Sequence, residues 1–141
     1  MRKEEIVEFA TGLKRTYHTS DPYELAKIFG IRVEENIPCM KWFKAQAVKF
    51  KGYAPYIVIN RDYDERSRRI MCAHELGHIF LHDDTLNNFA NVGGKINMEA
   101  EYEANLFVLA LFEDQENLNM NMADIPSYLV HSIIEKSVER K

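Results

Sequence analysis

Three histidines and a glutamate share one short stretch of the chain and have the residue types and spacing of a metal centre. In RIMCAHELGHIFLHDD, which begins at Arg69, they are His74, His78 and His82, with Glu75 directly after the first histidine. The letters HELGH match HExxH, in which two imidazoles one helical turn apart reach a single zinc ion and the glutamate holds a zinc-bound water. The spacing therefore predicts metal-assisted hydrolysis, with His74 and His78 as ligands and Glu75 as general base.

Helical periodicity places this chemistry on one side of the expected helix. At roughly 100° per residue, the three histidines, Glu75 and Met71 fall within one arc, and the rest of the circumference is apolar or small. Such a helix is buried almost all round, so its polar arc lines an internal site. Unpaired imidazoles and a carboxylate are costly in that position, and a metal ion is an efficient partner for them.

A catalytic zinc site commonly has three protein ligands and one open position, so a third ligand is needed. A metzincin would have another histidine ten positions after the first ligand, but that position is Asp84. The other common choice is a glutamate from a following helix. The segment NMEAEYEANLFVLALF offers Glu99, Glu101 and Glu103.

Among these three glutamates, Glu103 is the predicted third ligand. Glu99 and Glu103 lie one turn apart on the apolar face of the expected helix, whereas Glu101 is expected to point away. A carboxylate on an apolar face needs a compensating charge, which Zn²⁺ would supply. Glu103 lies deeper in the apolar part and precedes the small Ala104, while Glu99 is a candidate for contacts with the ligands or with substrate. His82 is expected either to contact the ligands or the cleft wall, or to cap the C-terminal end of its helix.

Composition limits the class of protein. With 141 residues, of which 46% are hydrophobic, the chain is long enough for one packed domain, predicted to span residues 1–141. The net charge of -4 argues against a broad nucleic-acid surface. Cys39 and Cys72 form no CxxC, and neither a signal peptide nor a membrane-spanning run of about 20 apolar residues is evident, so a cytoplasmic location is expected.

The elements that must position the site follow from local signals. We expect N-terminal helices in 1–30, a sheet in 31–60, catalytic helices in 66–112 and a C-terminal helix over 124–139, opened by an aspartate ahead of a proline. The segments IRVEE, AQAVKF and PYIVIN predict the strands. The expected fold class is α+β, in which a small antiparallel sheet of about three strands packs against a mostly helical domain with the HExxH helix buried at its centre.

Two longer segments together resemble a known family. YIVINRDYDERSRRIMCAHELGHIFLH, followed by EAEYEANLFVLALF, is similar to the ImmA/IrrE family of zinc metallopeptidases, in which an AHELGHxxLH helix precedes an E-x-EAN-x-F helix. The resemblance covers roughly residues 20–112 and implies a zincin-like fold with one zinc ion per chain. It further implies that His74, His78 and Glu103 bind zinc and that Glu75 is the general base. The family's second motif usually continues into Leu-Leu-x-Pro, whereas LALFEDQEN contains no proline.

The resemblance also implies a function. Similar proteins, often carried by prophages or integrative elements, cleave a helix-turn-helix repressor and so release the genes that it silences. The expected partner is therefore a protein, without direct binding of nucleic acid or membrane. The alternative is a zinc-bound binding module, or anti-repressor, that sequesters the regulator without cutting it, although a purely structural zinc site has no use for Glu75.

Two further expectations concern how a peptide substrate would be held. The developing oxyanion needs a donor from another segment, and His131, Tyr56 and Tyr102 are the candidates. If the strand in APYIVIN is a sheet edge beside the zinc, an extended peptide can pair with it through main-chain hydrogen bonds.

Overall fold

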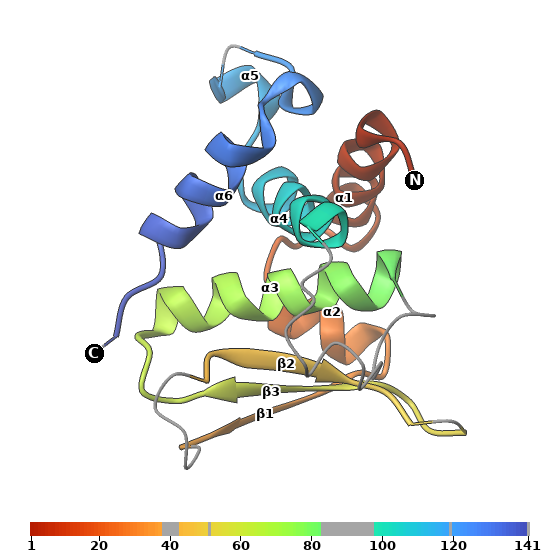
Figure 1. The fold of residues 1–141 in the computed structure, drawn as a ribbon. Helices are drawn as coiled ribbons and strands as arrows, with labels where there is room; N and C mark the ends of the chain where they lie inside the picture. Colours follow the sequence, from red (N-terminus) through yellow and green to blue (C-terminus); the bar gives the residue numbers. More distant parts are fainter. Residues whose placement is uncertain (38–42, 51, 83–97, 119, 141) are drawn as a thin grey trace.

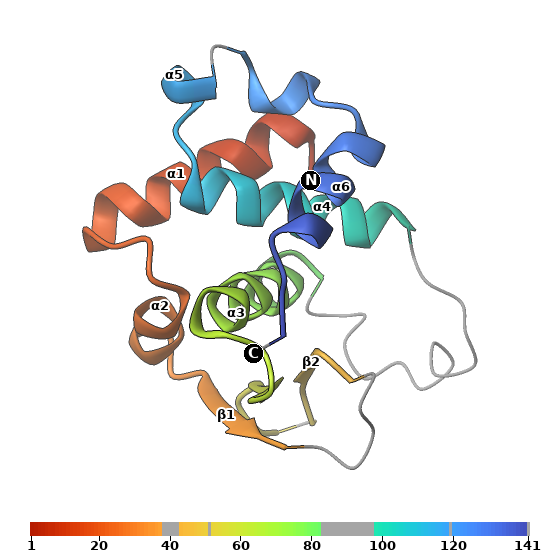
Figure 2. The ribbon, with the colours of Figure 1, turned by 90° about the vertical axis from the view of Figure 1, so that its left-hand side faces the viewer.

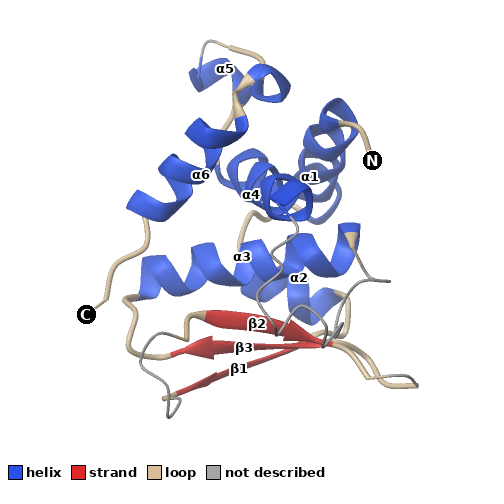
Figure 3. Ribbon diagram, in the orientation of Figure 1, coloured by secondary structure: helices blue, strands red, loops and turns tan. Residues whose placement is uncertain are grey.

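The computed structural model describes residues 1–37, 43–50, 52–82, 98–118 and 120–140 and confirms an α+β fold. A small sheet forms one layer, α3 lies across it, and α1 and α4 lie on the other side of α3 (Figure 1, Figure 3). The elements are α1 (Lys3–Tyr17), α2 (Pro22–Ile28), β1 (Arg32–Asn36), β2 (Ala45–Val48), β3 (Tyr56–Asn60), α3 (Glu65–Leu81), α4 (Met98–Phe112), α5 (Gln115–Leu118), the 3₁₀ turn η3 (Met122–Asp124) and α6 (Ser127–Lys136).

The three strands form a mixed sheet in the order β1-β3-β2, so the expectation of a purely antiparallel sheet is wrong. Successive strands do alternate in direction, but β3 lies between the two earlier strands and therefore runs parallel to β1 and antiparallel to β2. The sequence explains this order, because YIVIN is the most apolar strand and RVEEN carries the charges typical of an edge. Since β3 is paired on both sides, the expectation that it offers a free edge to a peptide is also wrong.

Helix α3 is the buried centre of the fold, as predicted. Its N-terminus is capped by Asp64, whose side chain accepts a hydrogen bond from the Ser67 backbone N–H at 2.8 Å. Hydrogen bonding to the side chain of Ser67, and then to its backbone N–H, lowers the pKa of the Asp64 carboxyl below its usual value. Viewed along its axis, α3 lies between the strands and the α1/α4 pair (Figure 2), which is why nearly its whole circumference is apolar.

Helices α3 and α4 approach each other closely at Gly77, the glycine within HELGH. A Cβ atom built there would lie 3.2 Å from the Ala104 Cα and 3.2 Å from the Phe107 Cδ1. The absent side chain at Gly77 and the small one at Ala104 therefore allow the two backbones to come together. This contact brings Glu101, about one turn before Ala104, and Asn105, directly after it, against the histidines of α3.

The C-terminal segment differs from the expectation in its boundaries. The last helix begins at Ser127 and not at residue 124, because Pro126 occupies its N-cap position and Asp124 belongs to η3. After α6, the chain returns to α3, where the Glu139 backbone N–H donates to the Ser67 Oγ at 2.6 Å. Helix α5 and η3 were not predicted, since both are too short to show a periodicity.

Two negative expectations also bear on the fold. No helix in the described residues combines the length and the apolar character needed to cross a membrane. Cys72 is a buried free thiol, and Cys39 lies outside the described residues. Burial raises the pKa of the Cys72 thiol well above its usual range, so this group is inert packing and not a ligand or nucleophile.

The close approach at Gly77 leads to a test with a matched pair of variants. We expect Gly12→Ala in α1, where nothing lies within 4 Å of the added Cβ, to raise the free energy of unfolding by up to about 1 kcal/mol through helix propensity. Gly77→Ala gains the same propensity but overpacks the backbone of α4, at a cost of about 1–3 kcal/mol, and is expected to destabilise. Urea unfolding of both variants measures the difference, and equal stabilisation by both would contradict the close contact.

Candidate metal centre

Three potential ligand atoms converge where α3 faces the first turns of α4. The Nε2 atoms of His74 and His78 lie 3.1 Å apart, and the Glu101 carboxylate lies 2.9 Å from the first and 3.1 Å from the second. The two histidines are mostly buried, and Glu101 is half-buried. Two imidazole nitrogens and one carboxylate oxygen are the donor set of a catalytic zinc site with one position left open.

The spacing and the hydrogen bonds of these donors fit a metal ion. Nitrogen and oxygen ligands around a tetrahedral zinc ion are roughly 3.3 Å apart, close to the separations observed here. The Nδ1–H of His74 donates to the Asn105 Oδ1 at 2.8 Å, which directs the Nε2 lone pair toward the other two donors. Sequence reasoning missed Asn105, although it lies four residues after Glu101, on the same helical face.

A second chain of hydrogen bonds supports His78. Its Nδ1 lies 3.2 Å from the Nδ1 of His82, and the Nε2 of His82 lies 2.7 Å from a carboxylate oxygen of Glu103. Because the carboxylate can only accept, His82 donates to Glu103 and accepts from His78, which leaves the His78 Nε2 free to bind a metal. His82 thus contacts His78, and it also occupies the C-cap position of α3.

The expected role of Glu103 as third ligand disagrees with this geometry. Glu103 is bonded to His82, and Glu101, which was expected to point away, meets His74 and His78. The physical reason is that α4 is buried on nearly all sides, so its apolar residues do not reveal which face meets α3. Glu99 is exposed and lines a surface hollow beside the N-terminus, and it is not among the residues that line the cleft with His74.

Glu75 lies beside the three donors without joining them. Its side chain is buried, and its Oε2 accepts a hydrogen bond from the Ala47 backbone N–H of β2 at 2.8 Å. This bond holds the carboxylate at the wall of a cleft of about 300 Å³ that His74, Glu101 and Asn105 also line. The anchoring N–H of Ala47 was not predictable from HExxH, since it comes from the sheet edge.

Of the three candidate oxyanion donors, His131 is the one that lines this cleft. It comes from α6, and its Nε2 lies 3.8 Å from Glu135. Tyr102 instead donates to the backbone oxygen of Ile125 at 3.4 Å, and Tyr56 packs under the Arg32 guanidinium on the far side of the sheet.

The electrostatics of the site favour a charged pair when no metal is bound. Burial opposes charging of His74, but the hydrogen bond to Glu101 and the nearby Glu75 carboxylate outweigh it and raise the pKa of His74 above its ordinary value. Burial likewise opposes charging of Glu101, and the hydrogen bonds from His74 and His78 outweigh it, holding the pKa of Glu101 well below its usual range. Glu101 is therefore ionised at neutral pH, as a metal ligand must be.

An HExxH helix buried against a small sheet, with a carboxylate supplied by the next helix, defines the centre of a metallopeptidase-type domain. A family model described as "IrrE N-terminal-like domain", of the peptidase M78 family, matches residues 13–124, and the chain belongs to this family. The resemblance to ImmA/IrrE proteins is thereby confirmed.

One curated relative and the solved structures complete the comparison. The chain is 35% identical over 101 residues to the "Uncharacterized immunity region protein 2" of Bacillus phage phi105, a match that covers 70% of this chain and 62% of that protein. The match thus spans somewhat less than two thirds of the relative's length. No solved structure matches the chain.

Three substitutions in α4 test which of its glutamates binds zinc. We expect Glu101→Gln to weaken zinc binding most, because it removes a donor, and Glu103→Gln to weaken it by the about 10–100-fold typical of a residue that orients a ligand. Glu99→Gln, at an exposed position of the same helix, is the control and should bind as the wild type does. Competition with a chromophoric chelator measures all three affinities, and a larger loss for Glu103→Gln than for Glu101→Gln would contradict the geometry.

The raised pKa of His74 predicts how zinc binding depends on pH. Zinc must displace the proton of His74, which the folded protein holds more tightly than a free histidine does. As the pH is lowered, the affinity for zinc should therefore begin to fall while the pH is still above 6.5, the ordinary pKa of histidine. Below the raised pKa the fall should approach about tenfold per pH unit for each displaced proton. Calorimetry in buffers with different ionisation heats counts the protons released, and an affinity that is flat from pH 8 down to 6 would contradict the shift.

Proposed function

We propose that this chain is a zinc-dependent endopeptidase that cleaves a helix-turn-helix repressor of a prophage or integrative element and thereby releases the genes it silences. The observation that carries the proposal is the convergence of His74, His78 and Glu101 within 3.1 Å of one another, beside a buried Glu75 that is not a ligand. Membership of the peptidase M78 family supports hydrolysis of a peptide bond.

In the proposed mechanism, His74, His78 and Glu101 would hold the zinc ion, which would supply Lewis-acid chemistry for a peptide carbonyl and an attacking water. Glu75 takes the proton of the attacking water and passes it to the leaving amine. The Ala47 N–H fixes the Oε2 of Glu75, so the other carboxylate oxygen is the one that faces the reaction.

Two walls of the cleft would bind the substrate. His131 on α6 is placed to donate a hydrogen bond to the developing oxyanion. The second wall includes β2, which is an edge strand of the sheet, whereas β3 is central. The Lys44 oxygen accepts a hydrogen bond from the Asn60 N–H, so Lys44 faces β3. The alternate residues Ala45 and Ala47 therefore direct their backbone groups away from β3. An extended peptide can pair with Ala45, which also lines the cleft.

Two observations support the proposed substrate: the name of the similar phage protein and the net charge of this chain. The similar phage protein is named for an immunity region, which is consistent with a repressor-related partner. The net charge of -4 disfavours action on the DNA itself, so the repressor protein is the proposed partner. A reaction on such a regulator would take place in the cytoplasm.

The proposal is tested with the repressor encoded nearest to the gene for this chain. We expect the zinc-loaded wild type to cut it at a defined bond, detected by mass spectrometry, and Glu75→Gln to lose about 10²–10⁴ in rate while keeping its zinc, because only the base is removed. Chelation should abolish cleavage, and added zinc should restore it.

The same experiment separates catalysis from sequestration. A wild type that binds the repressor with full zinc but leaves it intact, with Glu75→Gln binding equally well, would contradict the peptidase and indicate an anti-repressor module. Glu99→Gln serves again as the control, since its side chain is remote from the cleft.

A further inference from the structure

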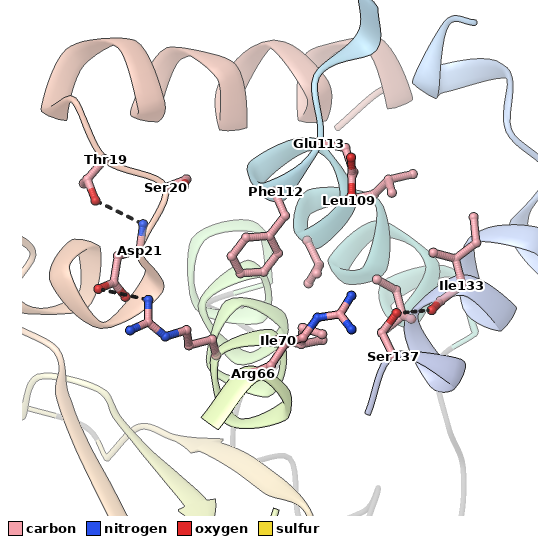
Figure 4. Close-up of a pocket in the computed structure, with 13 residues that line it drawn as sticks. Thr19, Ser20, Asp21, Arg66, Ile70, Leu109, Phe112, Glu113, Ile133 and Ser137 are labelled. Atoms are coloured by element: carbon pink, nitrogen blue, oxygen red, sulfur yellow. Dashed lines mark hydrogen bonds and ion pairs between the residues drawn. The ribbon is translucent and has the colours of Figure 1, made fainter. Parts of the chain in front are cut away.

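A second, larger cavity lies on the other side of α6 from the metal cleft. It encloses about 490 Å³, within the range of about 300–1,000 Å³ that is typical of small-molecule sites. The turn between α1 and α2, the first turns of α3, the end of α4 and one face of α6 surround it (Figure 4). The proposed peptidase mechanism makes no use of this cavity.

The walls of the cavity combine six apolar side chains with seven polar or charged ones, two of which are acidic. The buried side chains of Ile70 in α3 and Leu109 in α4 form its floor, and the partly exposed Phe112 and Ile133 also line it (Figure 4). Phe112 and Ile133 are each 38% exposed to solvent, a large fraction for apolar residues that border a hollow. A ligand with an apolar body would remove this surface from water, which is the main source of affinity in such pockets.

One cation at the cavity is available to a ligand. Arg69 is already held by Asp21 at 3.6 Å and by Glu65 at 3.1 Å. Arg66 also lines the cavity, and within the part of the chain that the structure describes it forms no ion pair at 4.0 Å or less. Its guanidinium extends between α3 and α6 without a bonded partner among the residues drawn in Figure 4. A free guanidinium beside an apolar hollow suits a carboxylate.

Helix α6 separates the cavity from the metal cleft and contacts both. His131 and Glu135 line the cleft, whereas Ile133 and Ser137, about 200° around the helix, line the cavity. Ile134 touches both spaces. All ten residues of α6 are described; Val130 is the one fully buried side chain among them, and Ile134 packs partly buried against the core.

We infer that this cavity is a binding site for a small aliphatic carboxylate, with the acid group on Arg66 and the chain on the apolar floor. Occupation of the site adds apolar contacts to the exposed side of α6 and so steadies the helix that carries His131. The site binds in the absence of a protein substrate, and the inference therefore stands apart from the proposed peptidase activity.

The test uses octanoate as the probe and the zinc-loaded, nitrogen-15-labelled full chain. We expect saturable amide shifts at Asp21, Leu109 and Ser137, and slower amide hydrogen exchange in α6. Arg66→Gln should weaken octanoate binding about tenfold, the loss expected for one partly exposed charged hydrogen bond. Arg61→Gln, an exposed arginine remote from the cavity, is the matched control and should bind as the wild type does.

A neutral analogue and the location of the shifts complete the design. Octanamide keeps the aliphatic chain but carries no charge, so it should bind the wild type about tenfold more weakly than octanoate does. Arg66→Gln should bind octanamide and octanoate with the same affinity. Equal binding of octanoate to the wild type and Arg66→Gln would overturn the inference. Shifts confined to His74 and His78 would do so as well, since they would show the carboxylate bound at the metal. Both readouts are independent of cleavage, so a failure here leaves the peptidase proposal untouched.

Discussion

The fold and its site depend on how closely α3 and α4 approach each other. At Gly77 the helices leave no space for a side chain, and the Cα of Ala104 would lie only 3.2 Å from a Cβ at that position. This short separation carries Glu101 and Asn105 to the histidine edge of α3. A wider crossing would take Glu101 away from His74 and His78, so the glycine within the motif matters to this cluster as much as the charged residues beside it.

The same contact explains how so many polar groups are tolerated near the core. His74 is bonded to Asn105 and Glu101, His78 continues through His82 to Glu103, and Glu75 is held by a backbone N–H of β2. Buried polar groups are stable where each has a partner, and a partly satisfied network would be worse than an apolar core. The network also orients the imidazole rings of the two HExxH histidines, as the outer hydrogen bonds of a metal site would.

The sequence predicts what is local and fails where long-range packing decides. HExxH specifies His74, His78 and Glu75 because one helical turn joins them, and the bounds of α3 and the three strands follow from periodicity. The position of β3 within the sheet and the face of α4 that meets α3 depend on contacts between distant segments. The sequence does contain a signal for the face of α4 that meets α3: Glu101 and Asn105 are polar residues four positions apart in an apolar run. The prediction favoured Glu103 because its surroundings are more apolar.

The central claim is that this pair of helices forms a three-ligand metal centre through Glu101. Anomalous diffraction at the zinc edge from crystals of the zinc-loaded chain tests it most directly. The account predicts one peak about 2.0–2.2 Å from the Nε2 of His74, the Nε2 of His78 and a carboxylate oxygen of Glu101, with Glu75 nearby but unbound. A peak coordinated by His82 and Glu103, or a zinc ion bound without Glu101, would contradict it.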